Sequence, residues 1–254
     1  MGNNFIDLSG STYLITGASS GIGRAISKMC YQLGANLILL GRDSNKLAET
    51  TQNMDSAKYR TVTCDLMELD KIESMVKNEL LKFGKINGFC HSAGYEITLP
   101  LKAMKPEAYI DILTVNSIAG FELAKILSKK KYCNEDGASF VYISSITGIV
   151  SRPGLTAYSA SKGAVISAVK SMALELAPKK IRVNSISPGT VLTPLIKDFI
   201  NRLEPDKRIQ RLSEYPLGLG NPEDIANMVV FLLSERSKWI TGTNIVIDGG
   251  YTAK

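Results

Sequence analysis

Short apolar runs alternate with longer amphipathic segments along almost the whole chain. The runs carry no regular polar alternation, which is typical of strands buried on both faces of a sheet. We expect strands at residues 12–16, 36–40, 59–64, 86–91, 138–144, 181–187 and 243–248. Helical spacing predicts helices near 23–33, 43–53 and 69–84, a long one after Pro106, and one at 222–234. This alternation predicts an α/β fold with a doubly wound, seven-stranded parallel sheet and helices on both faces.

The length of the chain and its alternation of predicted strands and helices indicate its domain organisation. A chain of 254 residues is long enough for one α/β domain of this kind, so we expect a single domain over residues 1–254. Residues 193–220 are long, charged and break the alternation. This insertion is either a lid over a substrate site or an additional surface helix.

A glycine-rich turn, TGASSGIG, lies between the first predicted strand and the first helix, at residues 16–23. Its glycines, Gly17, Gly21 and Gly23, permit a tight turn and close backbone approach, and the helix N-terminus offers free N–H groups to a pyrophosphate. The spacing is GxxxGxG, and Ile26 takes the third glycine position of the GxGxxG pattern. The position of the turn favours a dinucleotide-binding domain of the Rossmann type over a bare turn.

Cofactor preference depends on the end of the second predicted strand. An acid about 20 residues beyond the turn would bind the adenosine ribose of NAD, but Gly41 occupies that position and Arg42 follows. A guanidinium there can hold a 2′-phosphate. We therefore expect NADP(H), with NAD(H) as the alternative if Asp43 contacts the ribose instead.

Composition excludes several other classes. The formal net charge of +6 is ordinary for a soluble protein and also suits an anionic ligand, but no dense basic run with interleaved aromatics predicts nucleic-acid binding. The four cysteines form no metal-ligand spacing, and His91 is the single histidine, so no metal site is expected. No signal peptide or membrane-length apolar run is found, so we expect a cytoplasmic protein with no membrane partner.

The stretch AYSASKGAV places Tyr158 and Lys162 four residues apart. If the segment is helical, the two side chains share one face. Taken alone, this spacing fits an exposed pair on a surface helix as well as an active site.

Together the glycine turn, the arginine after the second strand and YSASK resemble the short-chain dehydrogenase/reductase family. The resemblance covers essentially the whole chain. Further matching segments are CDL (64–66), SAG (92–94), VN (115–116), ISS with a following glycine (143–148), ISPGTVLT (186–193), and ITG with VIDGGY (240–251).

The resemblance implies a catalytic tetrad. Tyr158 and Lys162 are its YxxxK pair, and Asn116 is the asparagine within the long helix. Ser144 and Ser145 compete for the serine, and the family's usual spacing of 13 residues before the tyrosine selects Ser145.

Roles for these residues follow from the chemistry of carbonyl reduction. Tyrosine has a pKa of about 10, so an ammonium one turn away would lower the pKa of Tyr158 and let it act as general acid/base. Lys162 would also orient the cofactor, Ser145 would bind the substrate oxygen, and Asn116 would interrupt the helix and hold a water in a relay to Lys162.

The resemblance also implies the cofactor contacts. Thr193 would bind the nicotinamide carboxamide, and Asp65 would meet adenine unless it serves as a helix N-terminal acid. The complete expected set is Gly17, Ser19, Ser20, Gly21, Ile22, Gly23, Arg42, Asp65, Leu66, Ser92, Ala93, Gly94, Tyr158, Lys162, Pro188, Gly189, Val191 and Thr193.

One segment departs from the family pattern. Ser92 stands where an asparagine is usual, and a serine braces the turn with shorter reach. His91 precedes it. We interpret His91 as a packed or backbone-bonded side chain, with a role as a base as the alternative.

The expected function is an NADP(H)-dependent oxidoreductase that interconverts a ketone or aldehyde and an alcohol. Length and motif layout are similar to those of 3-oxoacyl carrier-protein reductases, for which Lys129–Lys131 or Arg208 and Arg211 would supply a basic docking patch. Sugars, steroids and small ketones remain open as substrates. A non-catalytic dinucleotide-binding redox sensor is the alternative from another class, and the resemblance also implies a homotetramer or homodimer.

Overall fold

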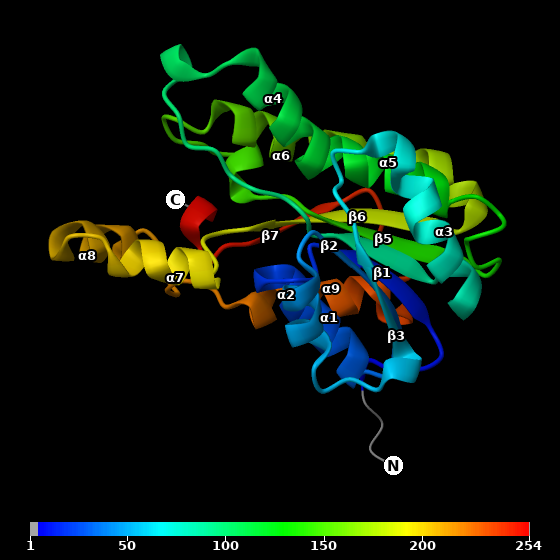
Figure 1. Cartoon of the computed structure of the whole chain (residues 1–254). Helices are drawn as coiled ribbons and strands as arrows, with labels where there is room; N and C mark the ends of the chain where they lie inside the picture. Colours follow the sequence, from blue (N-terminus) through cyan, green and yellow to red (C-terminus); the bar gives the residue numbers. More distant parts are fainter. Residues whose placement is uncertain (1–4, 254) are drawn as a thin grey trace.

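A computed structural model describes residues 5–253, and within that stretch the chain forms one parallel sheet. The strand order is β3-β2-β1-β4-β5-β6-β7 (Figure 1). The strands are β1 (Thr12–Thr16), β2 (Asn36–Gly41), β3 (Tyr59–Thr63), β4 (Gly88–His91), β5 (Ala138–Ile143), β6 (Ile181–Pro188) and β7 (Asn244–Ile247). The predicted seven-stranded parallel sheet is confirmed. The fourth strand begins at Gly88 rather than at residue 86. Ile86 lies outside the strand and forms an isolated bridge with Cys133.

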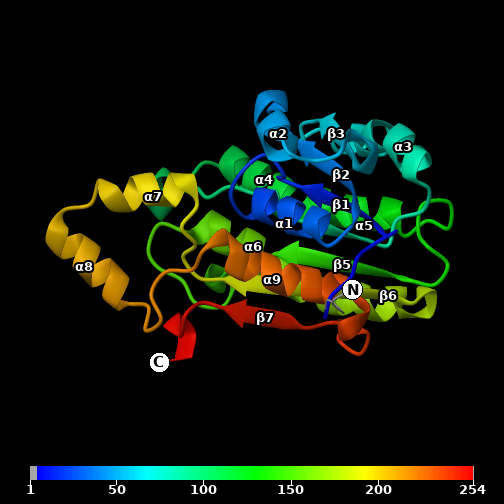
Figure 2. The ribbon, with the colours of Figure 1, turned by 90° about the horizontal axis from the view of Figure 1, so that it is seen from below.

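Helices cover both faces of the sheet. One face carries α1 (Gly21–Gln32), α2 (Ser44–Thr51) and α9 (Pro222–Leu233). The other carries α3 (Ile72–Phe83), α4 (Pro106–Leu113), α5 (Ala119–Leu127) and α6 (Thr156–Leu176). Figures 1 and 2 show the two layers from perpendicular directions.

Alternate strand residues supply two separate apolar cores, one on each face. Leu14 of β1 packs into the core beneath α3, α5 and α6, whereas its neighbour Ile15 packs into the core beneath α1 and α9. Because side chains on a strand alternate between faces, each strand must be apolar throughout to fill both cores. This requirement explains the uninterrupted apolar runs of the sequence.

The long helix expected after Pro106 is interrupted. Between α4 and α5 the chain forms a π-helical turn, Thr114–Ile118, in which the Ala119 N–H donates to the Thr114 carbonyl. A regular α-helix would send that N–H to the carbonyl of Val115. The interruption agrees with the expectation that Asn116 lies where regular helix bonding is broken.

Residues 193–220 extend beyond the carboxyl ends of the strands. They form α7 (Pro194–Asn201) and α8 (Pro205–Ser213), which project from the main body (Figures 1 and 2). The carboxyl edge of a doubly wound sheet is where such folds bind ligands. The insertion therefore stands next to the edge where a site is expected.

No helix in the described part of the chain is long and apolar enough to cross a membrane.

Candidate active site

The glycine turn forms a cradle at the carboxyl end of β1. Gly17 has a φ of +67°, and a Cβ there would lie 2.9 Å from the backbone of Ala93. A Cβ on Gly23 would come within 2.2 Å of the Gly17 carbonyl oxygen. Since α1 begins at Gly21 with no acidic side chain in its first turn, its N–H groups are available to an anion.

Two cavities meet at the turn that follows β4. One, of ≈ 530 Å³, runs from the glycine turn past the end of β2. The other, of ≈ 720 Å³, runs from the same place toward α7. Ser92, Gly94 and Tyr95 line both of them. An elongated ligand can therefore span the two cavities across residues 92–95.

The structure brings nearly all of the predicted cofactor residues to these walls. The first cavity is lined by Gly17, Ser19, Ser20, Arg42, Asp65, Leu66, Ser92, Ala93 and Gly94. The second is lined by Ile22, Ser92, Gly94, Tyr158, Lys162, Pro188, Gly189, Val191 and Thr193. Gly21 and Gly23 belong to the glycine turn but are not among the residues that line the two cavities, and a Cβ on Gly21 would lie 3.0 Å from Thr193 Cγ2.

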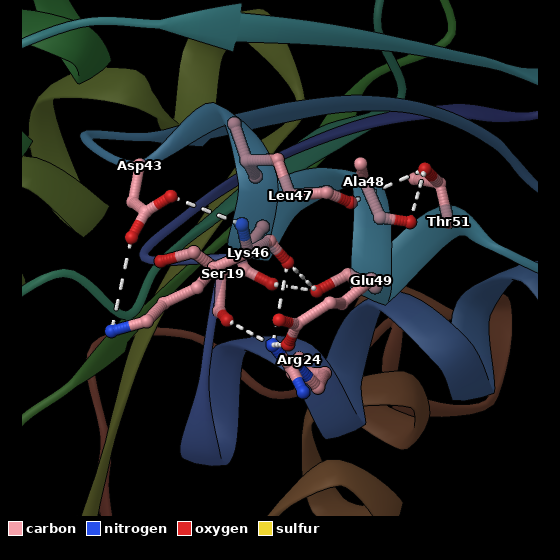
Figure 3. Close-up of polar contacts among 10 residues, drawn as sticks. Ser19, Arg24, Asp43, Lys46, Leu47, Ala48, Glu49 and Thr51 are labelled. Carbon is pink, nitrogen blue, oxygen red and sulfur yellow. Dashed lines mark hydrogen bonds and ion pairs between the residues drawn. The ribbon is translucent and has the colours of Figure 1, made fainter.

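Two positively charged side chains, Arg42 and Lys46, line the first cavity near the end of β2. Arg42 is exposed at the cavity wall. Asp43 is the N-cap of α2, and its carboxylate accepts from the Lys46 N–H at 3.1 Å (Figure 3). Lys46 also lines the cavity and was not anticipated from the sequence; its Nζ lies 3.8 Å from Asp43 Oδ2. Arg42 and Lys46 therefore place two cations on the wall of the first cavity, while the Asp43 carboxylate caps α2 and lies beside Lys46.

A second residue that sequence reasoning missed is Arg24 of α1. Its Nη2 donates to the Ser19 carbonyl at 2.6 Å and to Glu49 Oε2 of α2 at 2.9 Å (Figure 3). Arg24 thus ties the glycine turn to α2. The motif alone gives no signal for this contact, because its partners lie in another helix.

Asp65 is exposed at the wall of the first cavity, and its carboxylate accepts from the Met67 N–H at 3.0 Å. It is not in the first turn of α3, which begins at Ile72. The alternative of a helix N-terminal acid is therefore wrong, and contact with a ligand stays a prediction.

Tyr158 and Lys162 lie in the first part of α6 and both line the second cavity. Lys162 Nζ is 5.8 Å from the centre of the Tyr158 ring and donates to the Ile143 carbonyl at 2.9 Å. Lys162 is buried, and an exposed surface pair is therefore excluded.

The pKa of Tyr158 shifts in the opposite direction to the one expected. Burial raises the pKa of Tyr158 to about 12, although the Ser145 hydroxyl beside the phenol lowers it in part. Burial also lowers the pKa of Lys162 to about 8. The predicted lowering of the Tyr158 pKa by Lys162 is therefore not found, because the ammonium is directed to the Ile143 carbonyl rather than to the phenol oxygen.

The structure separates the two candidate serines. Ser144 is buried and donates to the Lys162 carbonyl at 2.8 Å, which fastens β5 to α6. Both serines line the second cavity, and Ser145 Oγ accepts from the Thr147 N–H at 3.2 Å. Because the hydroxyl beside the Tyr158 phenol is that of Ser145, Ser145 is the better placed of the two.

Asn116 lies in the π-helical turn, beneath the 92–95 turn rather than in the cavity wall. Its Oδ1 accepts from the Tyr95 N–H and its Nδ2 donates to the Tyr95 carbonyl, both at 3.0 Å. The same Nδ2 lies 3.0 Å from Ser161 Oγ on α6. The geometry makes Asn116 a brace between this turn and α6; the water relay to Lys162 stays a prediction.

His91 is buried and bonded at both ring nitrogens, to Thr16 and to the carbonyl of Val115. This arrangement agrees with the interpretation of a backbone-bonded side chain. Burial, together with the charge of Lys162, lowers the pKa of His91 to about 4, so the ring is neutral at physiological pH.

Comparison with known proteins identifies the family. A family model described as enoyl-(acyl carrier protein) reductase matches residues 17–252. The chain is 35% identical over 246 residues to a 3-oxoacyl-(acyl-carrier-protein) reductase of Rickettsia felis, covering 96% of this chain and 98% of that protein. It is 32% identical over 249 residues to a glucose 1-dehydrogenase of Gluconobacter oxydans, covering 96% of this chain and 92% of that protein.

A solved structure is similar over the same extent. The crystal structure of a short-chain type dehydrogenase/reductase from Mycobacterium marinum superposes with a TM-score of 0.89 at 31% identity, covering 98% of each chain. Family model, relatives and structure all span nearly the whole chain. The chain therefore belongs to the short-chain dehydrogenase/reductase family of oxidoreductases.

Proposed function

We propose that this protein is an NADP(H)-dependent oxidoreductase that interconverts a ketone or aldehyde and an alcohol. The observation that carries the proposal is the junction of the two cavities at residues 92–95. Through it, a ligand held at the glycine turn reaches the cavity that contains Tyr158, Lys162 and Ser145. A non-catalytic redox sensor would need the first cavity but not this group of side chains.

The preference for NADP(H) rests on charge. Arg42, which follows β2, and Lys46 of α2 both line the first cavity, where a 2′-phosphate would form charge-assisted hydrogen bonds with them. The Asp43 carboxylate caps α2, which argues against its use for a ribose hydroxyl. NAD(H) is the alternative cofactor.

The bound cofactor would supply the hydride. Tyr158 would give a proton to the substrate oxygen, and Ser145 would hold that oxygen by a hydrogen bond. Lys162, whose pKa burial lowers to about 8, is close to its titration point near neutral pH. It would assist the proton transfer and orient the ligand from beneath the phenol.

For the substrate, we favour a 3-oxoacyl group on a carrier protein. The lid side chains Leu195, Ile196 and Phe199 give the second cavity an apolar wall that suits an acyl chain. The relatives named as 3-oxoacyl reductases support this choice, while the glucose dehydrogenase relative makes a sugar the second candidate.

A carrier protein would approach beside the lid. Arg208 of α8 is exposed on the lid, whereas Arg211 of the same helix lines the second cavity and pairs with Glu214. Lys129 and Lys131 form ion pairs with Glu73 and lie near Ile86, which precedes β4. Since that is the opposite end of the strand from the site, the lid is the better-placed patch.

The test of the proposal follows NADPH oxidation by absorbance against a panel of 3-oxoacyl thioesters, sugars and small ketones. We expect turnover with at least one carbonyl class, and with NADPH preferred over NADH. Absence of turnover with every class, despite measurable cofactor binding, would favour the sensor.

Arg42→Asp tests the cofactor assignment. Because it replaces a phosphate partner with a repelling carboxylate, we expect the preference for NADPH over NADH to fall by about 10² or more. Arg202→Asp on the lid is the matched control for the change in charge. A preference left unchanged by Arg42→Asp would refute the assignment.

A further inference from the structure

The single histidine of the sequence connects two parts of the fold beneath the candidate cofactor site. His91, at the end of β4, is 1% exposed. Its Nδ1 lies 3.0 Å from Thr16 Oγ1 at the end of β1, and its Nε2 lies 3.1 Å from the Val115 carbonyl oxygen. The ring therefore bridges the glycine-turn strand and the π-helical turn.

These partners determine the tautomer of the ring. The Val115 carbonyl can only accept, so Nε2 carries the proton, and the neutral ring then presents a lone pair at Nδ1. Thr16 Oγ1 donates to that lone pair. The same oxygen accepts from the N–H groups of Ser92 at 3.1 Å and Ala93 at 3.0 Å. The hydroxyl thus donates one hydrogen bond and accepts two, which is its full capacity.

The π-helical turn supplies the second partner. The Ala119 N–H donates to Thr114 instead of to Val115, so the Val115 carbonyl loses its regular helical donor. His91 donates to this released oxygen. A buried carbonyl without a donor is costly, and the histidine therefore supports the turn that carries Asn116.

The fold also leaves space for the ring. A Cβ on Gly120 of α5 would lie 2.8 Å from His91 Cδ2 and 2.9 Å from its Cγ. The Tyr142 hydroxyl donates to the Gly120 carbonyl at 2.9 Å and holds this segment of α5 in place. An alanine at position 120 would displace the imidazole from both of its partners.

We propose that His91 is a positioning residue that acts through Thr16. By accepting a hydrogen bond from the Thr16 hydroxyl, it orients Thr16 Oγ1 to accept hydrogen bonds from the Ser92 and Ala93 amides, which fixes the turn at the junction of the two cavities. This turn is tightly packed: a Cβ on Gly94 would lie 3.3 Å from Lys162 Nζ and 3.0 Å from Asn116 Oδ1. The effect on cofactor affinity rests on the proposed function; the bonding pattern does not.

The bonding pattern is tested directly by ¹⁵N NMR of protein labelled at histidine and prepared without a histidine tag. His91 is the only histidine, so its two ring nitrogens need no assignment by mutation. We expect a neutral ring protonated at Nε2 at pH 7. A ring protonated at Nδ1, or a charged ring at that pH, overturns the proposal.

Three substitutions of His91 distinguish the contribution of its hydrogen bond with Thr16 from that of its hydrogen bond with Val115. His91→Phe removes both, and we expect the Kd for NADPH to rise about tenfold while kcat at saturating cofactor changes less. An asparagine places its amide at the δ position, so His91→Asn should restore most of the affinity through Thr16. His91→Gln reaches only the ε position and should not. Equal affinity in the Phe and Asn variants would overturn the mechanism.

A matched control distinguishes positioning from a general loss of stability. Ser139→Ala removes a buried hydrogen bond to the Leu232 carbonyl, at the opposite end of the strands. It should lower the free energy of unfolding without changing the Kd for NADPH.

If the wild-type protein binds no NADPH, the proposed function fails. Hydrogen exchange at the Ser92 and Ala93 amides then still tests the inference about His91. The Ser92 and Ala93 amides should exchange faster in His91→Phe, and not in Ser139→Ala. Unchanged exchange at these two amides in a folded Phe variant overturns the inference independently of any cofactor.

Discussion

At the scale of single residues, the main feature is a buried ammonium close to the half-buried Tyr158 ring. Lys162 is 4% exposed, and its ammonium donates to the Ile143 carbonyl at 2.9 Å. Burial of a charge without a counter-ion costs stability, so the protein keeps Lys162 at an energetic disadvantage. Sites that serve chemistry often carry such a cost.

Lys162→Met should therefore make the protein more stable and inactive. The pKa of Lys162 falls from 10.5 to about 8 on folding, and at about 1.4 kcal/mol per pKa unit the gain at pH 7 is on the order of 2 kcal/mol after loss of the Ile143 bond. Urea unfolding of the variant and the wild type measures this difference.

The pH dependence gives a sharper check. Between the folded pKa of about 8 and the unfolded value of 10.5, the unfolded wild type binds more protons, so its stability rises with pH. The advantage of the Met variant should shrink as the pH rises from 8 to 10. An advantage that stays constant across this range would argue that Lys162 is not buried as a charge.

At the scale of elements, the sequence predicts what depends on local pattern and misses what depends on contacts between distant segments. The first strand, the glycine turn and the first helix follow from an apolar run, glycine spacing and a helix start. The π-helical turn has no such local signal and was expected only from the family resemblance, since Asn116 is held there by contacts with Tyr95 and Ser161. His91 and Thr16 meet across 75 residues for the same reason.

The predicted site shows the same division. The family motifs predicted that Tyr158, Lys162 and Ser145 share one site, and all three line the second cavity. Spacing could not give the direction in which the Tyr158 pKa shifts, because burial in the folded chain decides it. Lys46 and Arg24 were missed because their roles depend on where α2 packs.

The lid offers a test at this scale. Phe199 of α7 lines the second cavity and is 50% exposed, whereas Ile209 of α8 is 67% exposed and stands outside that cavity's lining. We expect Phe199→Ala to raise the KM for the carbonyl substrate by roughly fivefold and to leave NADPH affinity unchanged. Ile209→Ala should change neither value. Equal effects of both substitutions would show that α7 acts as an ordinary surface helix.

At the scale of the whole molecule, the expectation of a homo-oligomer rests on family resemblance. The structure exposes apolar side chains on the helical layer that contains α4 and α6, among them Ile110 and Leu174. Light scattering after size-exclusion chromatography should give the mass of a dimer or tetramer of the 27.6 kDa chain. A monomer mass that persists as the concentration is raised would contradict this expectation.

The central claim concerns the whole assembly of cofactor cradle, cavity junction and Tyr158. It predicts that the protein moves a hydride from the cofactor to a carbonyl carbon, with the proton supplied by the tyrosine. Tyr158→Phe keeps the ring and removes the hydroxyl, so it should bind NADPH normally and lose turnover by about 10² or more.

Deuterium transfer tests that claim most directly. With NADPH that carries deuterium in place of both hydrogens on the reactive carbon of the nicotinamide, mass spectrometry of the product should find one deuterium per alcohol for the wild type and almost no product for Tyr158→Phe. Product alcohol without deuterium, or full activity in Tyr158→Phe, would contradict the account.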